Sequence, residues 1–284
     1  MLYFMRNAIL FFLILAPALS AAIPAFTDEP PKITRAQIEA ANPEKIDIWR
    51  EKKWNHEEYS KTNLPIVVST LEDTTSFSKI DEERGRGFLD LPIYMPDQGW
   101  KIPPSLEQFK ELISKAVQCE KLFNTDFEQD HYVYITIAQS FVEPNMSQRR
   151  RAWHADSYRR KMEKLGTDID HIYLAYDIQP TLFSRSSFDF NGVNKEDLTE
   201  VLDHFNNGAE PHEKVEYPTY TLLRLDPYVV HNANTNTTED RVFRTFARLS
   251  ISKKRYRNAS CSHNNLFEYN WESTSRWNRQ QHLK

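Results

Sequence analysis

The alternation of apolar and polar positions predicts one clear helix followed by a series of strands. Residues 103–123 open with two prolines and then carry apolar residues at helical spacing, with Ser105 as the expected N-cap. The apolar face consists of Leu106, Phe109, Leu112, Ile113 and Val117. Residues 131–141 then alternate with the period of a strand, which predicts Tyr132, Tyr134, Thr136 and Ala138 on one face and Val133, Ile135 and Ile137 on the other.

The rest of the chain continues in short apolar runs separated by turns. Residues 171–183 form one run, stopped by Pro180, and three further strands are expected within 217–226, 228–233 and 241–253. Residues 194–208 predict a helical insert, capped by Asn194 and ended by Gly208. This order indicates an α+β, mainly β fold: a β-sandwich or barrel with flanking helices.

The N-terminal third differs in character from this region. Residues 1–22 have a single Arg6, an apolar run and small residues at the end, which is typical of a secretory signal peptide. An uncleaved anchor is the alternative, although the run is short for a bilayer. We therefore expect a secreted protein, or one of the periplasm or secretory pathway, with no stable membrane span after cleavage. Residues 23–100, with candidate helices at 34–42 and 47–61, are expected to be an extension packed on a main domain of residues 101–284 with an aromatic C-terminal tail.

Charge and cysteine content narrow the class of protein. The 284 residues carry a net charge of −4, so nothing in the overall charge points to nucleic acid as a partner. Cys119 and Cys261 are the two cysteines, too few for a disulfide scaffold, and the sequence leaves open whether they are bridged.

A candidate metal site comes from the stretch Trp-His-Ala-Asp. On an extended chain His154 and Asp156 project to the same side, because residues two apart share a face. His231 ends an apolar run and leads into a polar turn, which suits a third ligand at the mouth of a barrel. Two histidines and one carboxylate with open positions favour Fe(II), although a zinc hydrolase with the same ligands is an alternative.

The last predicted strand adds candidate anion receptors. Arg244, Phe246, Arg248 and Ser250 share one of its faces, and Arg241 and Phe243 share the other. Arginines that point inward are costly unless each meets an anion, and a guanidinium can hold a carboxylate with two parallel hydrogen bonds. A dicarboxylate that chelates the metal with one end and pairs with arginine at the other would fit, and 2-oxoglutarate is such a molecule.

Three motifs in this order, WHAD, YVVHNA and RTFARLSIS, resemble the Fe(II)/2-oxoglutarate-dependent oxygenases across residues 130–256. The resemblance implies a double-stranded β-helix (jelly roll) with His154, Asp156 and His231 as iron ligands. It implies that Arg244 pairs with the far carboxylate of 2-oxoglutarate and that Arg248 meets the near carboxylate or the substrate. Arg248 and Ser250 also resemble the R-x-S of other branches, so the roles of the arginines stay open. The tail suggests a narrower, little-characterised branch.

Other residues have a functional and a structural interpretation. Tyr134 could reach the co-substrate from a facing strand, or it could line a mixed core face. Arginines 149–151 with Arg159 and Arg160 could draw an anionic substrate toward the metal, or they could be a solvated surface. Trp153 is expected to pack beside the metal.

These features together predict an Fe(II)- and 2-oxoglutarate-dependent dioxygenase that hydroxylates a small molecule or a peptidyl side chain. One alternative is a cupin-like metal-dependent hydrolase or isomerase that does not use 2-oxoglutarate. The other is a secreted jelly-roll binding protein without catalysis. The substrate and the oligomeric state do not follow from the sequence.

Overall fold

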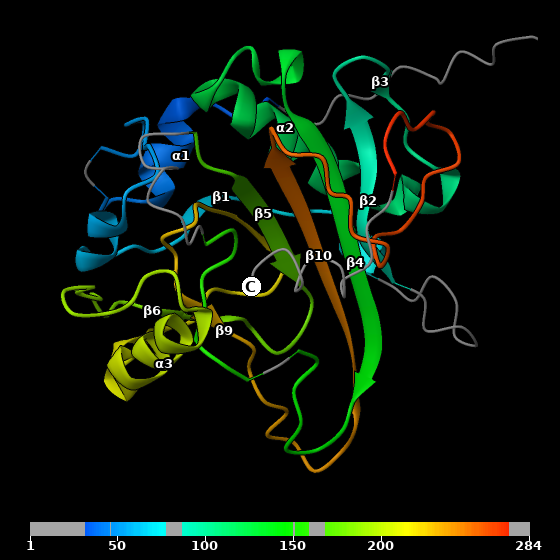
Figure 1. Cartoon of the computed structure of the whole chain (residues 1–284). Helices are drawn as coiled ribbons and strands as arrows, with labels where there is room; N and C mark the ends of the chain where they lie inside the picture. Colours follow the sequence, from blue (N-terminus) through cyan, green and yellow to red (C-terminus); the bar gives the residue numbers. More distant parts are fainter. Residues whose placement is uncertain (1–31, 46, 78–86, 150, 159–167, 273–284) are drawn as a thin grey trace, which may run out of the picture.

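The strands form two antiparallel sheets in the computed structural model, which describes residues 32–45, 47–77, 87–149, 151–158 and 168–272. The predicted signal peptide, Arg150, Arg159 and Arg160 lie outside the described residues. The large sheet has the strand order β1-β8-β5-β10-β4-β2-β3, and the small sheet has the order β7-β6-β9 (Figure 1). The strands are β1 (Ile66–Thr70), β2 (Phe88–Met95), β3 (Gly99–Trp100), β4 (Tyr132–Val142), β5 (His171–Tyr176), β6 (Leu182–Ser184), β7 (Lys214–Val215), β8 (Thr221–Leu225), β9 (His231–Asn232) and β10 (Val242–Ser252).

The path of the chain between the sheets is that of a jelly roll. After β4 in the large sheet, His154 pairs with β9 of the small sheet. The chain then returns to β5, crosses to β6 and β7, returns to β8, crosses to β9 and ends in β10 of the large sheet. A cluster of buried side chains from β5, β6 and β8 fills part of the space between the two sheets. The predicted fold class, mainly β with a jelly-roll core and flanking helices, is therefore confirmed.

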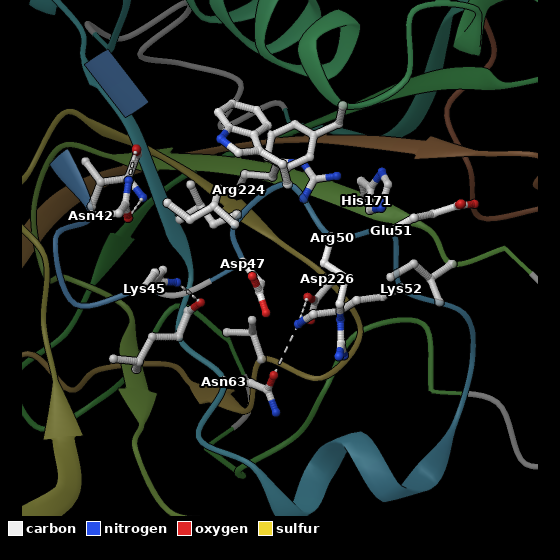
Figure 2. Close-up of a pocket in the computed structure, with 18 of the residues that line it drawn as sticks. Asn42, Lys45, Asp47, Arg50, Glu51, Lys52, Asn63, His171, Arg224 and Asp226 are labelled. Atoms are coloured by element: carbon white, nitrogen blue, oxygen red, sulfur yellow. Dashed lines mark hydrogen bonds and ion pairs between the residues drawn. The ribbon is translucent and has the colours of Figure 1, made fainter. Parts of the chain in front are cut away.

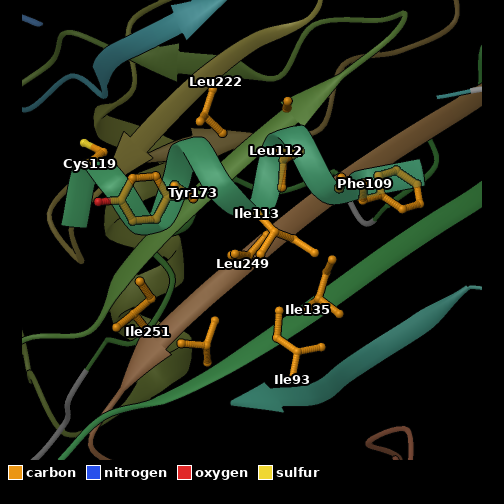
Figure 3. Packing of buried hydrophobic residues seen from close by; sticks show 14 of the residues in the cluster. Ile93, Phe109, Leu112, Ile113, Cys119, Ile135, Tyr173, Leu222, Leu249 and Ile251 are labelled. Atoms are coloured by element: carbon orange, nitrogen blue, oxygen red, sulfur yellow. The ribbon is translucent and has the colours of Figure 1, made fainter. Parts of the chain in front are cut away.

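The largest hydrophobic core lies on the outer face of the large sheet, under the helix α2 (Lys110–Phe123). Figure 3 shows Leu112 and Ile113 of this helix directed at Leu249 of β10 and Ile135 of β4. Ile135 and Leu249 are cross-strand partners, and both are fully buried. Because side chains alternate along a strand, this register sends the odd-numbered residues of β10 into the core and the even-numbered ones, Arg244 and Arg248 among them, toward the small sheet.

Segments outside the roll extend the large sheet at both edges. β1 pairs with β8, and β2 pairs with β4. The helix α1 (Arg35–Ala41) packs on β1, and its capping box on Thr34 confirms the predicted helix at 34–42. At the other edge the aromatic tail lies against β2 and β4, where Phe267 is buried in a cluster with Tyr134.

Three local predictions were wrong. Residues 47–61 form only a short 3-10 helix, His56–Ser60, because Trp54 and Tyr59 are drawn into an aromatic cluster where both are fully buried. Ser105 lies inside the 3-10 helix Pro104–Phe109 that precedes α2, so it caps nothing. The inserted helix α3 (Leu198–Gly208) ends as predicted at Gly208, but it begins after Asp197, whose carboxylate accepts from the Thr199 N–H.

Two further features bear on the earlier expectations. No helix within the described ranges is long and apolar enough to cross a membrane. Cys119 lies on the buried face of α2 and is not bridged to Cys261.

We expect Ile135→Ala to lower the free energy of unfolding by about 2–5 kcal/mol, because it leaves a cavity between α2 and the large sheet. Urea denaturation measures this loss. Leu266→Ala is the control: that side chain is 47% exposed, so its truncation should cost about 0.5 kcal/mol or less. Equal losses in both variants would contradict this account of the core.

Candidate metal centre

The two predicted histidine ligands are neighbours on paired strands. His154 and His231 exchange both backbone hydrogen bonds, with N···O distances of 3.0 and 2.9 Å. Directly opposite residues of an antiparallel pair project to the same side of the sheet, and the two imidazole centroids are 4.5 Å apart. Asp156 follows His154 in a tight turn in which Ser157 has a positive φ of 60°.

The three side chains converge on one point. One potential ligand atom from each of His154, Asp156 and His231 lies within 4.8 Å of the others. His154 Nε2 is 4.0 Å from Asp156 Oδ1, and His231 Nε2 is 3.9 Å from Asp156 Oδ2. These separations exceed hydrogen-bonding distance, which leaves room for an ion among the three groups.

Hydrogen bonds on the far side of each ring fix its orientation. The Nδ1 of His154 lies 2.8 Å from the Ala152 carbonyl, and the Nδ1 of His231 lies 3.0 Å from the Val229 carbonyl. A carbonyl only accepts, so each Nδ1 carries the proton and each Nε2 keeps its lone pair. Metal-ligating histidines are commonly oriented in this way.

The electrostatics of the cluster favour a neutral imidazole beside an ionised carboxylate. Burial and the neighbouring His154 lower the pKa of His231 to about 4, against the opposing effect of Asp156. Burial acts to raise the pKa of Asp156, but Arg248 and the two histidines lower it to about 2. Near neutral pH His231 and Asp156 are therefore both in the protonation state that a metal ligand needs.

Arg248 is tied to the carboxylate of the cluster. Its Nη1 donates to Asp156 Oδ2 at 3.1 Å, and its Nη2 donates to Asp90 Oδ1 at 2.8 Å. Asp90 lies at a register shift in β2 with a φ of 47°, and the Thr136 hydroxyl donates to its carboxylate. Bulges of this kind redirect side chains near functional sites. Burial acts to lower the pKa of Arg248, but the two carboxylates, Asp156 and Asp90, raise it above the usual value. The guanidinium is therefore charged and paired with both.

Arg244 is buried more deeply than the half-buried Arg248, but no carboxylate of the described residues pairs with it. It is 5% exposed, and its Nε donates to the Ile178 and Gln179 carbonyls at 2.9 and 3.2 Å. Its Nη1 donates to Gln148 Oε1 at 2.6 Å. Burial lowers the pKa of Arg244 to about 10, although Asp177 opposes this. No carboxylate of the described residues lies within ion-pair distance of it, so the guanidinium is held by hydrogen bonds to neutral oxygens and lies near the rings of Tyr176 and Phe246.

The remaining predicted residues are dispersed. The Tyr134 hydroxyl donates to the Lys254 carbonyl and accepts from the Tyr256 N–H, so it serves the C-terminal segment rather than facing an open site. Ser250 is buried opposite Tyr134 in the β4–β10 register.

Arg241 is exposed and lies over the Phe141 ring. Trp153 is buried beside His154, and its backbone N–H donates to Asn206 of α3.

Sequence reasoning missed two residues that hold the arginines. Asp90 is the partner of Arg248, and a lone acid in an otherwise apolar strand was a signal that could have identified it. Gln148 is the partner of Arg244, and nothing in its polar surroundings distinguishes it.

The segment that delivers His231 is clamped by the N-terminal extension. The Tyr59 hydroxyl donates to the Pro227 carbonyl at 2.6 Å. The Tyr228 hydroxyl donates to the Lys53 carbonyl at 2.7 Å and accepts from the Asn55 N–H at 2.8 Å. The extension therefore fixes the turn between β8 and β9, from which His231 follows directly.

No protein-family model and no curated protein matches the sequence. The structure is similar to HygX from Streptomyces hygroscopicus, solved with nickel and 2-oxoglutarate bound, at 12% identity and a TM-score of 0.43, covering 78% of this chain and 97% of that chain. It is also similar to IDO from Bacillus thuringiensis, at 11% identity and a TM-score of 0.42, covering 70% and 93%. EvdO2 from Micromonospora carbonacea var. aurantiaca has 12% identity and a TM-score of 0.38, covering 72% and 93%. Because the identities and TM-scores are low, the proposed function rests on the geometry of the site.

We expect Tyr59→Phe to lower the free energy of unfolding by about 1–3 kcal/mol, because it leaves the buried Pro227 carbonyl without its donor. Urea denaturation measures the loss. Tyr220→Phe is the matched control, since that hydroxyl donates no hydrogen bond to the described part of the chain and its removal should cost little. A loss in Tyr59→Phe no larger than in the control would show that the clamp is not energetically important.

Proposed function

We propose that the chain is an Fe(II)- and 2-oxoglutarate-dependent oxygenase that hydroxylates a small molecule or a peptidyl side chain. The observation that carries this proposal is the contrast between the two arginines of β10. Arg248 already has two carboxylate partners, one of them in the metal cluster, whereas the buried Arg244 on the same face has none within ion-pair distance among the described residues. A dianion that spans from the metal to Arg244 would supply the missing charge.

The residues of the cluster fit Fe(II). His154, Asp156 and His231 present two imidazole nitrogens and one carboxylate from one side, which is the donor set of non-haem iron oxygenases and leaves positions open on the other side. When bound there, Fe(II) together with 2-oxoglutarate and oxygen supplies the oxidising power to convert a C–H bond to C–OH, with succinate and CO₂ as co-products.

The two arginines then have different tasks. Arg244 is the receptor for the far carboxylate of 2-oxoglutarate and fixes the direction in which the co-substrate enters. Arg248 acts as a positioning residue: its hydrogen bond to Asp156 holds the carboxylate toward the histidines. Its other terminal nitrogen, Nη2, donates to Asp90. This assignment separates the roles that the sequence left open between the two arginines.

We expect His231→Ala and Asp156→Ala each to weaken Fe(II) binding by more than the roughly 10–100-fold that loss of an outer-shell partner costs, because each removes a ligand. Anaerobic calorimetric titration with Fe(II) measures the change. His204→Ala is the matched control: this histidine lies on α3 outside the cluster, so its removal should leave the affinity unchanged. Undiminished Fe(II) affinity in both ligand variants would remove the cluster from consideration.

We expect Arg244→Ala to weaken 2-oxoglutarate binding about tenfold or more, because it removes charged hydrogen bonds to a carboxylate. The visible absorption band that a chelated keto acid gives with Fe(II) under anaerobic conditions provides the measurement. Arg241→Ala is the control, since this arginine of the same chain region is exposed and should not alter the titration.

The same titration separates the rival functions. An unchanged affinity in Arg244→Ala would transfer the receptor role to another residue. Fe(II) binding without any band in the wild-type protein would favour a cupin-like hydrolase or isomerase. Failure to bind metal at all would favour a binding protein without catalysis.

A further inference from the structure

A second pocket lies away from the metal cluster, between the N-terminal extension and the large sheet. Its volume is about 850 Å³, within the usual range of small-molecule sites. Residues 41–45, 47–53, 62–64, 66 and 67 form one wall, and side chains of β5, β8 and the turn after β8 form the other (Figure 2). None of His154, Asp156 and His231 lines this pocket.

Three cations gather around a single acid in its interior. Lys52 donates to Asp226 at 2.7 Å and is thereby paired. Lys45 instead donates to the Leu64 and Pro65 carbonyls and has no ion-pair partner among the described residues. Burial lowers the pKa of Lys45 to about 7, Asp226 opposes this, and Lys52 and Arg224 lower it further. An ammonium group in this position lacks a compensating anion.

Arg224 gives the pocket a second unsatisfied donor. Its side chain is 6% exposed, and its Nε donates to Glu120 Oε2 at 3.3 Å and to the Tyr173 hydroxyl at 3.1 Å. Its two terminal nitrogens make no hydrogen bond to the described parts of the chain, although Arg224 lines the pocket. His171 stands on the same wall, with its Nδ1 held by Glu120 at 2.7 Å.

The same end of the pocket is lined by two half-buried aromatic rings, Phe123 and Trp49. The Arg224 guanidinium carbon lies 3.8 Å from the centroid of the Phe123 ring, and the rings of Phe123 and Trp49 are 4.5 Å apart. The acids that line the pocket besides Asp226 are Glu44, Asp47, Glu51 and Asp168, and all four have exposed or half-exposed side chains. The interior is therefore cationic and aromatic, while the acids other than Asp226 are more open to solvent.

We propose that this pocket is a binding site for a small organic anion: a carboxylate or phosphate group held by Lys45 and Arg224, on a flat apolar body that packs against Phe123 and Trp49. The head group satisfies donors that have no partner among the described residues, and the body packs against the half-buried rings. The site is independent of the proposed oxygenase function, because its residues and those of the metal cluster do not overlap.

Calorimetric titrations of the metal-free full chain test the proposal with three probes: benzoate, phenyl phosphate and the neutral isostere benzamide. Saturable binding of at least one anion, with benzamide at least tenfold weaker, is the expected result. The tighter of the two anions identifies the head group. Equal binding of benzamide and both anions, or no binding by either anion, would overturn the proposal.

Variants then locate the site. Lys45→Met and Arg224→Lys should each weaken the anion about tenfold or more, the loss typical of a charged hydrogen bond. Arg224→Lys keeps the charge beside Glu120, so it tests the site even if Lys45→Met folds poorly. Lys121→Met, an exposed lysine of α2 outside the pocket, should bind as the wild type does. Unchanged affinity in both pocket variants, or a loss in Arg244→Ala instead, would place the anion elsewhere and overturn the assignment.

Discussion

The candidate metal centre depends on the backbone pairing of His154 with His231. Two hydrogen bonds between these residues bring together parts of the chain that are far apart in sequence, and they set both imidazoles on the same side of the small sheet. The carbonyls of Ala152 and Val229 then orient the rings. Because the main chain fixes the two histidines, the centre needs only one further adjustment, the direction of the Asp156 carboxylate, and Arg248 provides it.

The charges between the two sheets explain why a co-substrate with two carboxylates suits this fold. Arg248 lies between Asp156 and Asp90, so that part of the interior is balanced without a ligand. Arg244 lies on the same face of β10, and its hydrogen bonds to the described residues all go to carbonyl and amide oxygens. A buried cation held by dipoles alone is costly, and proteins usually keep such a group where an anion will arrive. On the proposed function, a carboxylate of 2-oxoglutarate neutralises the buried charge of Arg244 between the two sheets.

Alternation along the strands predicted a β-sandwich or barrel with flanking helices, and the resemblance to the oxygenases implied the jelly roll and its metal ligands. Arg244 and Arg248 share a face of β10 as a period of two requires, whereas Asp156 reaches the histidines from a tight turn after His154. Contacts between residues that are distant in sequence leave no such periodic pattern. The partner of Arg248 is Asp90, which a local irregularity in β2 turns toward it. Residues 47–61 were mistaken for a helix because their aromatic residues serve tertiary packing, which overrides local propensity.

The N-terminal extension, which the jelly-roll pattern does not account for, contacts the turn that leads to His231 and forms one wall of the pocket. Tyr59 fixes the turn that leads to His231, and Lys52 binds Asp226 at the start of the same turn, where that turn also forms part of the pocket wall. Val229 belongs to this turn as well: it lines the pocket, and its carbonyl orients the His231 ring. The same turn therefore forms part of the pocket wall and orients the His231 imidazole. In this chain the extension is part of the support of the metal centre, and a core reduced to the roll alone would lack the contacts that hold His231.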